Sequence, residues 1–189
     1  MYKFGEDISY AYELLKADDF ENLQLFQCGN RQLDNHIKNA VIKNGAIVDE
    51  DGIYFKFIDL FTNKIIAVMS LATSGIVKKI DPYLHVLPAL KVDVLAVDVN
   101  YQKLHYNQES LDSSDPSDHY YFSDEIISTA VKLGYEIIEK YAMIDYVVVY
   151  ADKKAYRYYQ RNGFHDFENF MVKENNMEIR ENIPMYLEY

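Results

Sequence analysis

Four basic residues stand close together in a chain that is otherwise strongly acidic. Lys153, Lys154, Arg157 and Arg161 follow the apolar run at residues 146–150, in a stretch with the composition of a helix, while the whole chain carries a net charge of −11 at pH 7. Such a cluster can hold a phosphate group of a ligand, or it can simply form a solvated helix face. Both interpretations remain open at this stage.

Nucleophilic and metal chemistry find little support in the residue pattern. Cys28 is the only cysteine, no histidine pattern accompanies it, and a small buried apolar side chain is the better interpretation. The five histidines show neither an H-x-x-x-H spacing nor a cysteine partner, so we expect no metal site. They are His36, His85, His105, His119 and His165.

The basic cluster and three nearby tyrosines need a strand and a helix to position them. Residues 146–150 are β-branched or aromatic and predict a buried strand, after which Asp152 is a candidate N-cap for a helix. That helix is expected to end at Asn162 and Gly163, where glycine supplies a left-handed residue. Tyr156 and Tyr158 are interpreted as packing residues of this helix.

The remaining pattern predicts an α/β protein with a mixed, mostly antiparallel sheet and helices on both faces. Ser123 is the expected N-cap of a long buried helix, and Gly45 is the expected end of an earlier amphipathic helix. The expected helices cover residues 31–45 and 123–142, and the expected strands cover 53–60, 65–73, 92–98, 146–150, 166–172 and 183–189. An irregular stretch containing Pro82 and Pro88 is expected before the strand at residues 92–98.

Residues 104–122 interrupt this alternation of strands and helices. The segment is polar and acidic, without a periodic apolar face, and predicts an inserted loop with little internal order. With 189 residues the chain has room for one well-cored domain. We therefore expect residues 1–189 to form a single domain that carries an acidic insertion.

The composition indicates in which cellular compartment the protein resides and which kinds of partner it binds. The longest apolar stretch is too short and too interrupted to span a membrane, the amino-terminal residues lack the features of a signal peptide, and a lone cysteine suits a reducing compartment. We expect a cytoplasmic protein that does not bind a membrane. The acidic net charge disfavours nucleic acid and favours a cationic partner.

A family resemblance rests first on the segment that holds the basic cluster. Ala155, Tyr158, Tyr159, Gly163 and Phe164 are similar to the A-x-x-[FY]-Y-x-x-x-G-F signature of the GNAT superfamily of N-acetyltransferases. Two further segments resemble a toxin-like, prophage-type branch of that superfamily. They are Phe26, Cys28, Gly29, Leu33 and Asp34, and then Pro88, Ala89 and residues 95–98.

The resemblance implies a reaction and a set of roles. The expected reaction is direct attack of a primary amine on the thioester of acetyl-CoA, with Tyr159 protonating the departing thiolate. The strand near residue 92 should run parallel to the strand near residue 146 and diverge from it. Its main chain at Leu95, Ala96, Val97, Asp98 and Val99 should pair with the pantetheine arm, with a Val97 amide donating to the oxyanion. Asp93 is the candidate base, and His85 is an alternative.

One departure from the family pattern concerns the diphosphate. The expected [QR]-x-x-G-x-[GA] loop reads YQKLHY at residues 101–106 and contains no glycine. Either Lys103, Lys153, Lys154 or Arg157 compensates, or the protein is a catalytically inactive GNAT-fold binding protein. The acceptor would be a small-molecule, peptide or protein amine, and a homodimer is allowed.

Overall fold

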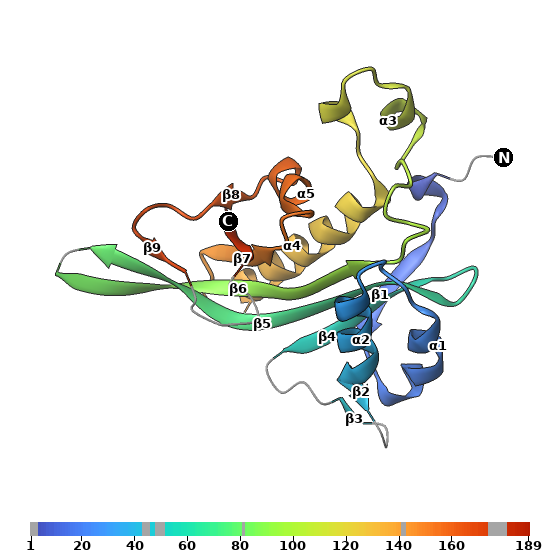
Figure 1. The fold of residues 1–189 in the computed structure, drawn as a ribbon, viewed down its shortest axis with the longest axis horizontal. Helices are drawn as coiled ribbons and strands as arrows, with labels where there is room; N and C mark the ends of the chain where they lie inside the picture. Colours follow the sequence, from blue (N-terminus) through green and yellow to red (C-terminus); the bar gives the residue numbers. More distant parts are fainter. Residues whose placement is uncertain (1–3, 43–45, 48–51, 81, 141–142, 174–180) are drawn as a thin grey trace. The chain divides into compact units, whose positions relative to one another are not determined.

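The computed structural model describes residues 4–42, 46–47, 52–80, 82–140, 143–173 and 181–189 (Figure 1). The chain divides into two compact units. Unit 1 comprises Met1–Ser70 and Val94–Ile127, and unit 2 comprises Leu71–Asp93 and Ser128–Tyr189. Two strands and one helix carry the chain from one unit into the other. In the part of the chain so described, no helix is both long and apolar enough to cross a membrane.

In unit 1, the strands form the antiparallel part of the sheet, in the order β1-β4-β5-β6. β1 pairs antiparallel with β4, from Tyr10 opposite Asp59 to Leu14 opposite Phe55. The strands are β1 (Tyr10–Leu14), β4 (Ile53–Asp59), β5 (Lys64–Ile80) and β6 (Tyr83–Val97). Two helices, α1 (Phe20–Leu25) and α2 (Arg31–Ala40), accompany them, with 3-10 turns at Gly5–Asp7 and Ala17–Asp19.

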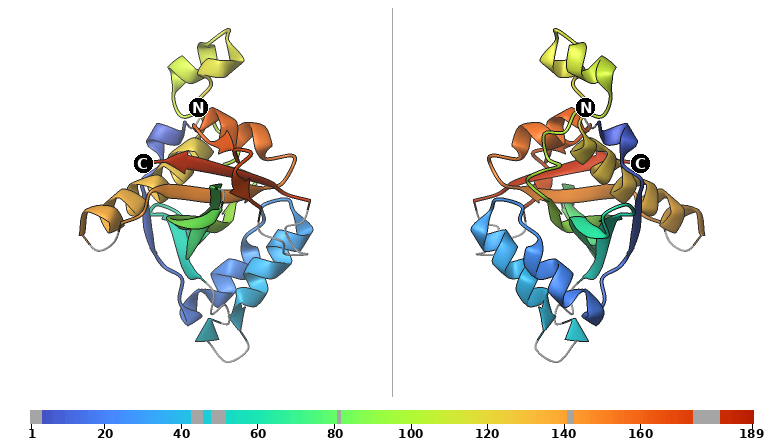
Figure 2. Two further views of the ribbon diagram at one scale, coloured as in Figure 1. Left: turned by 90° about the vertical axis from the view of Figure 1, so that its left-hand side faces the viewer. Right: turned by 90° about the vertical axis from the view of Figure 1, so that its right-hand side faces the viewer.

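Alternation along the strands gives the sheet of unit 1 two apolar faces. One face contributes Tyr54, Val94 and Ala96 to a core that also contains Leu23 of α1 and Ile37 of α2. The two helices lie together on one side of these strands (Figure 2). The other face carries Phe57 and Tyr10, and Tyr10 contacts Phe122 edge-on at 5.5 Å between ring centroids. Phe122 begins helix α4, so helices cover both faces, as the sequence predicted.

Unit 2 contains the parallel part of the sheet, with the strand order β5-β6-β7-β10-β8 and β9 attached to β5. β6 and β7 run parallel from Ala89 opposite Tyr146 to Val92 opposite Val149. The added strands are β7 (Tyr146–Ala151), β8 (His165–Asp166), β9 (Met171–Val172) and β10 (Ile183–Glu188). The mixed, mostly antiparallel sheet with a parallel central pair confirms the expected fold class.

Two helices complete unit 2. Within it, helix α4 (Phe122–Lys140) places Gly134 against Leu90 of β6 and the ring of Tyr189. The opposite face of these strands holds a cluster built on Ile76, Ala89 and Val148. Helix α5 (Tyr156–Arg161) is short and follows β7.

Several element boundaries differ from the predictions. β6 begins at Tyr83, so the stretch with Pro82 and Pro88 is largely strand rather than irregular. Pro88 fits there because, among the described strands, none pairs with β6 through an N–H at this position. α2 ends at Ala40, and Val41–Ile42 and Ala46–Ile47 pair as β2 and β3; the expected end at Gly45 lies outside the described residues. The strand expected at 166–172 is two short strands, β8 and β9.

The acidic insertion has more structure than the sequence predicted. It contains α3 (Gln108–Asp112) and a 3-10 turn at Pro116–Asp118, and it stands away from the strands of unit 1 (Figure 1). Ser110 is buried at its centre, where it donates to the Tyr120 carbonyl and accepts from the Tyr120 N–H, both at 2.8 Å. Local hydrogen bonds of Asn107, Ser110 and Asp115 stabilise these turns. The segment has no periodic apolar face, so its sequence pattern did not predict them.

Candidate active-site residues

Tyr159 is positioned by a turn that the sequence predicted in outline. β7 ends at Ala151, and the Asp152 carboxylate accepts the Lys154 N–H at 2.8 Å, so Asp152 closes the turn rather than capping α5. The helix begins after Ala155, whose side chain makes no cap. It ends as expected at Gly163, with φ of +84°, and the Phe164 N–H returns to the Tyr159 carbonyl at 3.0 Å.

The Tyr159 side chain is buried in unit 2. Its ring meets Phe164 edge-on at 5.5 Å and Tyr158 at 5.1 Å, and only 8% of the residue is exposed. Burial raises the pKa of the Tyr159 phenol well above its usual value near 10. Within the described part of the chain its hydroxyl has no hydrogen-bond partner. The group is therefore a neutral donor whose proton is available to an anionic acceptor.

The basic cluster lies on the same turn and helix. Lys153, Lys154 and Arg157 are exposed, and none of them forms an ion pair with another described residue. Arg161 stacks over the Tyr158 ring at 5.8 Å. Three cations without an acidic partner are suited to an anionic ligand, although exposed cations also occur as simple solvated residues.

The predicted cofactor strand belongs to unit 1 from Val94 onward. The Asp98 N–H donates to the Ile66 carbonyl of β5 at 2.9 Å, and the Val99 N–H donates to the Gln27 carbonyl at 2.9 Å. Because adjacent residues of a strand face opposite edges, Leu95 and Val97 direct their main-chain groups away from β5. Leu95 and Val97 thus keep amides that could pair with a ligand, while Asp98 and Val99 use theirs internally.

Asp98 has a structural role in the tight turn after β6. Its carboxylate accepts from the Asn100 N–H at 3.0 Å and from the Asn100 side chain at 2.8 Å. Gln102, which was not predicted as a site residue, donates to the carbonyls of Cys28 at 2.7 Å and Val97 at 2.8 Å. A glutamine in a polar loop carries no sequence signal for such a bridge. Lys103 is exposed beside it.

The ladder between β6 and β7 ends before either strand does. The last pair along the chain direction joins Val92 and Val149, yet β6 continues to Val97 and β7 to Ala151. The Pro88 carbonyl accepts the Asp145 N–H at 3.0 Å and so faces away from β5, whereas the Asp98 N–H faces β5. In a regular strand both residues would face one edge, so β6 contains a bulge between them.

Asp93, the expected base, forms an ion pair. Lys91 Nζ lies 2.9 Å from the Asp93 carboxylate, and the same ammonium lies 5.5 Å from the centre of the Tyr150 ring. Lys91 was not anticipated, although its i,i+2 spacing from Asp93 on a strand places both side chains on one face. The alternative base, His85, is exposed on the outer part of β6.

The start of α4 differs from a phosphate-binding helix start. The helix begins at Phe122, and Ser123 donates to the Gln102 carbonyl instead of acting as the N-cap. The buried Asp124 carboxylate accepts the Tyr121 N–H at 2.8 Å, and the Phe122 and Asp124 amides donate to protein carbonyls. Carboxylates at Asp124 and Glu125 already meet the positive end of the helix dipole.

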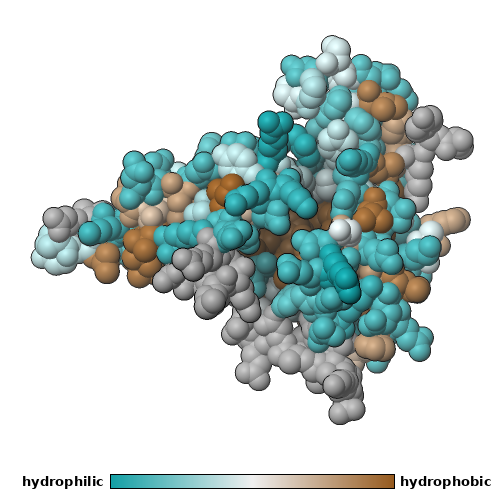
Figure 3. Space-filling model, viewed as in Figure 1, coloured by the Kyte–Doolittle hydropathy of each residue, from teal (hydrophilic) through white to brown (hydrophobic). Residues whose placement is uncertain are grey.

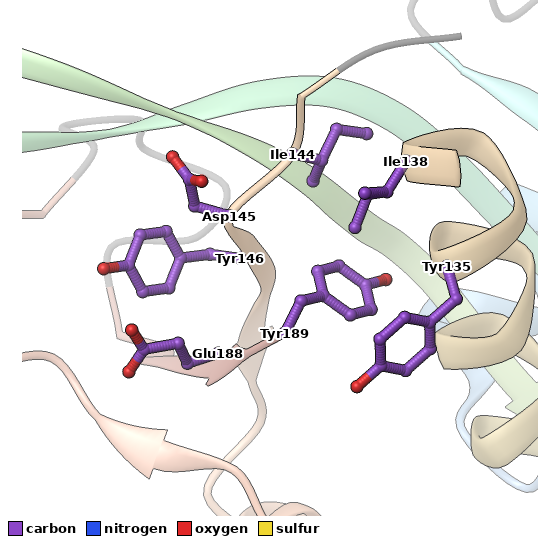
Figure 4. A pocket seen from close by; sticks show the side chains of 7 residues that line it. All are labelled: Tyr135, Ile138, Ile144, Asp145, Tyr146, Glu188 and Tyr189. Atoms are coloured by element: carbon purple, nitrogen blue, oxygen red, sulfur yellow. The ribbon is translucent and has the colours of Figure 1, made fainter. Parts of the chain in front are cut away.

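A cavity of ≈ 360 Å³ lies elsewhere in unit 2. It is lined by Tyr135, Tyr146 and Tyr189 with Asp145 and Glu188. The Asp145, Tyr146 and Glu188 side chains point to one side, and Tyr135 and Tyr189 lie on the other (Figure 4). The cavity is at the amino-terminal end of β7, whereas Tyr159 follows its carboxyl-terminal end. No group of three or more histidine, cysteine or acidic side chains that could hold a metal occurs among the described residues.

The fold was compared with those of known proteins. No family model and no curated protein matches the chain. Among solved structures, AtaT complexed with acetyl-methionyl-tRNAfMet aligns with a TM-score of 0.66 and 16% identity over 95% of this chain and 95% of that one. A mutant AtaT toxin with the antitoxin AtaR carboxyl terminus and acetyl-CoA gives 0.65 and 15% identity over 95% and 92%. The KacTA–DNA complex aligns with a TM-score of 0.65 and 15% identity over 95% of this chain and 93% of that one.

These neighbours are GNAT-fold toxins, so the chain has the GNAT fold and the resemblance to the toxin-like branch is confirmed at the level of fold. The expectation that disfavoured nucleic acid is wrong, because proteins of this fold occur in complexes with tRNA and with DNA. The error was to let the net charge of the whole chain stand for every surface. The net charge does not reveal a local basic group such as Lys153, Lys154 and Arg157.

Proposed function

We propose that the protein transfers the acetyl group of acetyl-CoA to a primary amine by direct attack. The proposal is supported by the GNAT fold and by acetyl-CoA in the structure of a fold neighbour. The observation that carries it is Tyr159, a buried phenol with a raised pKa, whose hydroxyl has no partner among the described residues, at the position where the family signature has its acid.

The proposed chemistry needs three groups from this chain. The amine nitrogen attacks the thioester carbonyl, a C–N bond forms, the C–S bond breaks, and the thiolate takes a proton from Tyr159. The Val97 amide is the candidate donor to the oxyanion. Asp93 is the candidate acceptor of the ammonium proton. Its carboxylate forms an ion pair with Lys91 at 2.9 Å.

Donor binding is proposed to depend on main-chain pairing and on exposed cations. Leu95 and Val97 offer edge groups to the pantetheine arm, whereas the Asp98 and Val99 amides are already engaged, and Ala96 faces β5. Lys103, Lys153 and Arg157 are the candidate phosphate contacts. The acceptor is proposed to be a primary amine of a small molecule, a peptide or a protein, or the amino group of an aminoacyl-tRNA, as the tRNA complex of a fold neighbour suggests.

A second candidate is a GNAT-fold protein that binds a partner without catalysis. The specific observation in its favour is the start of α4, where Asp124 and internal hydrogen bonds satisfy the amides that a diphosphate would use. Acetyl-CoA binding separates the two candidates.

Thermal unfolding with acetyl-CoA is the direct experiment. At a ligand concentration about 100 times the dissociation constant, linkage stabilises the folded state by about 2.7 kcal/mol. For a chain of this length we expect a rise in melting temperature of roughly 5–10 °C. No shift at millimolar acetyl-CoA would favour the binding protein.

Tyr159→Phe tests the acid, with Tyr158→Phe as the matched control on the adjacent residue. Tyr159→Phe should keep the acetyl-CoA shift and lower the turnover of a polyamine, peptide or aminoacyl-tRNA acceptor by roughly 10²–10⁴-fold, since only proton donation is lost. Tyr158→Phe should leave turnover within a few-fold of the parent, because its ring packs and its phenol has no assigned role. Full activity of Tyr159→Phe would remove the assigned acid.

A further inference from the structure

The outer part of the β5–β6 hairpin leaves one strand edge open. β9 covers the outer edge of β5 at Val77 and Lys78, and β7 pairs with β6 from Ala89 onward. Between Tyr83 and Leu87, no described strand pairs with the other edge of β6. This segment, which we call the arm edge, lies wholly within unit 2.

The hydrogen-bonding groups of the arm edge follow from Pro88. Its carbonyl accepts the Asp145 N–H at 3.0 Å, so residue 88 faces the edge away from β5. By the period of two, Leu84 and Val86 face the same edge, each with one N–H and one C=O. The side opposite is occupied by β5, where Gly75 lies close to Val86 and to the Leu87 carbonyl. The arm edge therefore presents two donors and two acceptors.

Apart from His85 the side chains of the arm edge are apolar or aromatic, and Tyr83, Leu84 and Val86 expose theirs on both faces of the hairpin. Tyr83 is 68% exposed, and Leu84 and Val86 are each 67% exposed, although successive residues of a strand face opposite sides. Hydrophobic residues are visible along this end of the molecule (Figure 3). Residues 83–87 carry no acidic residue, lysine or arginine, in a chain with a net charge of −11. Two such chains can meet here with the least repulsion.

We propose that the arm edge pairs with the arm edge of a second copy of this chain. The pairing is antiparallel about a two-fold axis at His85, so that Leu84 lies opposite Val86 of the partner subunit. Both donors and both acceptors of each copy are then satisfied by four hydrogen bonds. Pro88 has no N–H and ends the ladder. A second copy is favoured because this register matches the two donors and two acceptors of the edge to themselves.

The axis places two histidines side by side. In an antiparallel pair centred on His85, this residue and His85 of the partner subunit form the non-hydrogen-bonded pair, whose Cα atoms lie about 4.5 Å apart. Like charges at such a position are destabilising and opposite charges are stabilising. Charged substitutions at His85 therefore test the axis itself as well as the existence of a dimer.

The experiment compares three samples by sedimentation equilibrium. The parent protein should reach twice the 22.2 kDa of one chain, with a dissociation constant of about 1–100 µM, since a short edge buries little area. His85→Lys alone and His85→Asp alone should each be monomeric at the same concentrations. An equimolar mixture of the two variants should regain the dimer mass, because opposite charges then meet at the axis.

Controls separate this surface from others. Phe61→Lys changes a residue that is 93% exposed on the turn between β4 and β5 and should leave the dimer intact. Circular dichroism should show the same fold for all variants, as His85 is exposed. A parent protein that is monomeric at about 100 µM would overturn the proposal. This holds also if the arm edge then proves to bind a strand of another protein. Dimers in both single variants, or a mixture that stays monomeric, would overturn it as well.

Discussion

Burial sets the reactivity of two side chains that the sequence presents as chemically capable. Cys28 lies just before α2 and is 9% exposed. Its Sγ lies 3.8 Å from the Asn30 carbonyl oxygen. Burial, with a contribution from Asp34, raises the pKa of the Cys28 thiol to about 11. The same effect keeps Tyr159 protonated. Burial thus makes the Cys28 thiol a poor nucleophile and keeps the Tyr159 phenol able to donate a proton.

Thiol alkylation should report this directly. At pH 8 a thiol with a pKa of about 11 holds about 10²-fold less thiolate than one near 9, so iodoacetamide should modify native Cys28 at least that much more slowly than the unfolded chain. Mass spectrometry with and without denaturant measures the ratio, and Cys28→Ser gives the blank. Equal rates in the two states would show that the thiol is accessible in the native protein.

Side chains with a local pattern were predictable, and those with distant partners were not. Gly163 and Tyr159 belong to one short segment whose turn and helix follow from nearby residues. Lys56 is 5% exposed inside β4, where it pairs with Asp19 and with Glu13. A lysine in a strand is usually assigned to solvent, and its two partners come from segments far away in the sequence. The ion pair of Lys91 with Asp93 is local, yet only the structure shows that it forms.

At the scale of elements, helix α4 contains a glycine for a packing reason. A Cβ at Gly134 would lie 2.6 Å from Cζ of Tyr189, whose hydroxyl donates to the Val131 carbonyl at 3.3 Å. Tyr189 also meets Tyr135 edge-on at 4.5 Å. The helix gives up the better propensity of alanine so that this ring can lie against it.

Gly134→Ala should therefore destabilise the protein even though alanine favours a helix. We expect a loss of about 1–3 kcal/mol in the free energy of unfolding from displacement of the Tyr189 ring. In a Tyr189→Ala background the same change should instead stabilise by up to about 1 kcal/mol, through propensity alone. Urea denaturation of the four proteins completes the cycle, and equal effects in both backgrounds would exclude the ring as the cause.

Elements with a strong period were predictable, and so was the inner part of β6 at residues 92–97, whereas its outer part was not. α4 shows helical spacing over many residues and was located to within a residue at its start. Pro82 directly precedes β6 and Pro88 lies within it, and prolines usually interrupt strands. The outer half of β6 is also exposed on both faces. A half-buried strand alternates apolar and polar residues, and a fully buried strand is a continuous apolar run. A hairpin exposed on both faces shows neither pattern.

At the scale of the whole molecule, the 18 tyrosines affect stability at high pH. Burial, with smaller contributions from nearby groups in most cases, raises the pKa values of Tyr101, Tyr120, Tyr159 and Tyr189. Above pH 10 the unfolded chain releases phenolic protons that the folded chain retains. The unfolded state then binds fewer protons, so the free energy of unfolding falls as pH rises.

An alkaline titration should consequently show two groups of tyrosines. Exposed phenols should ionise gradually near pH 10, and the buried ones should ionise together with a cooperative loss of secondary structure at higher pH. Absorbance near 295 nm and circular dichroism recorded on one sample measure both. A single smooth ionisation with the fold intact would contradict the protection of the buried phenols.

The short parallel ladder between β6 and β7 has a consequence for the order of folding. Ala89 and Tyr146 become neighbours only after the insertion and the whole of α4 have been synthesised and the intervening chain has closed. The β5–β6 hairpin, in contrast, closes between adjacent strands and can form early. Folding should therefore be limited by a late docking step, and the apolar residues of β7 should be exposed to chaperones until that step is complete.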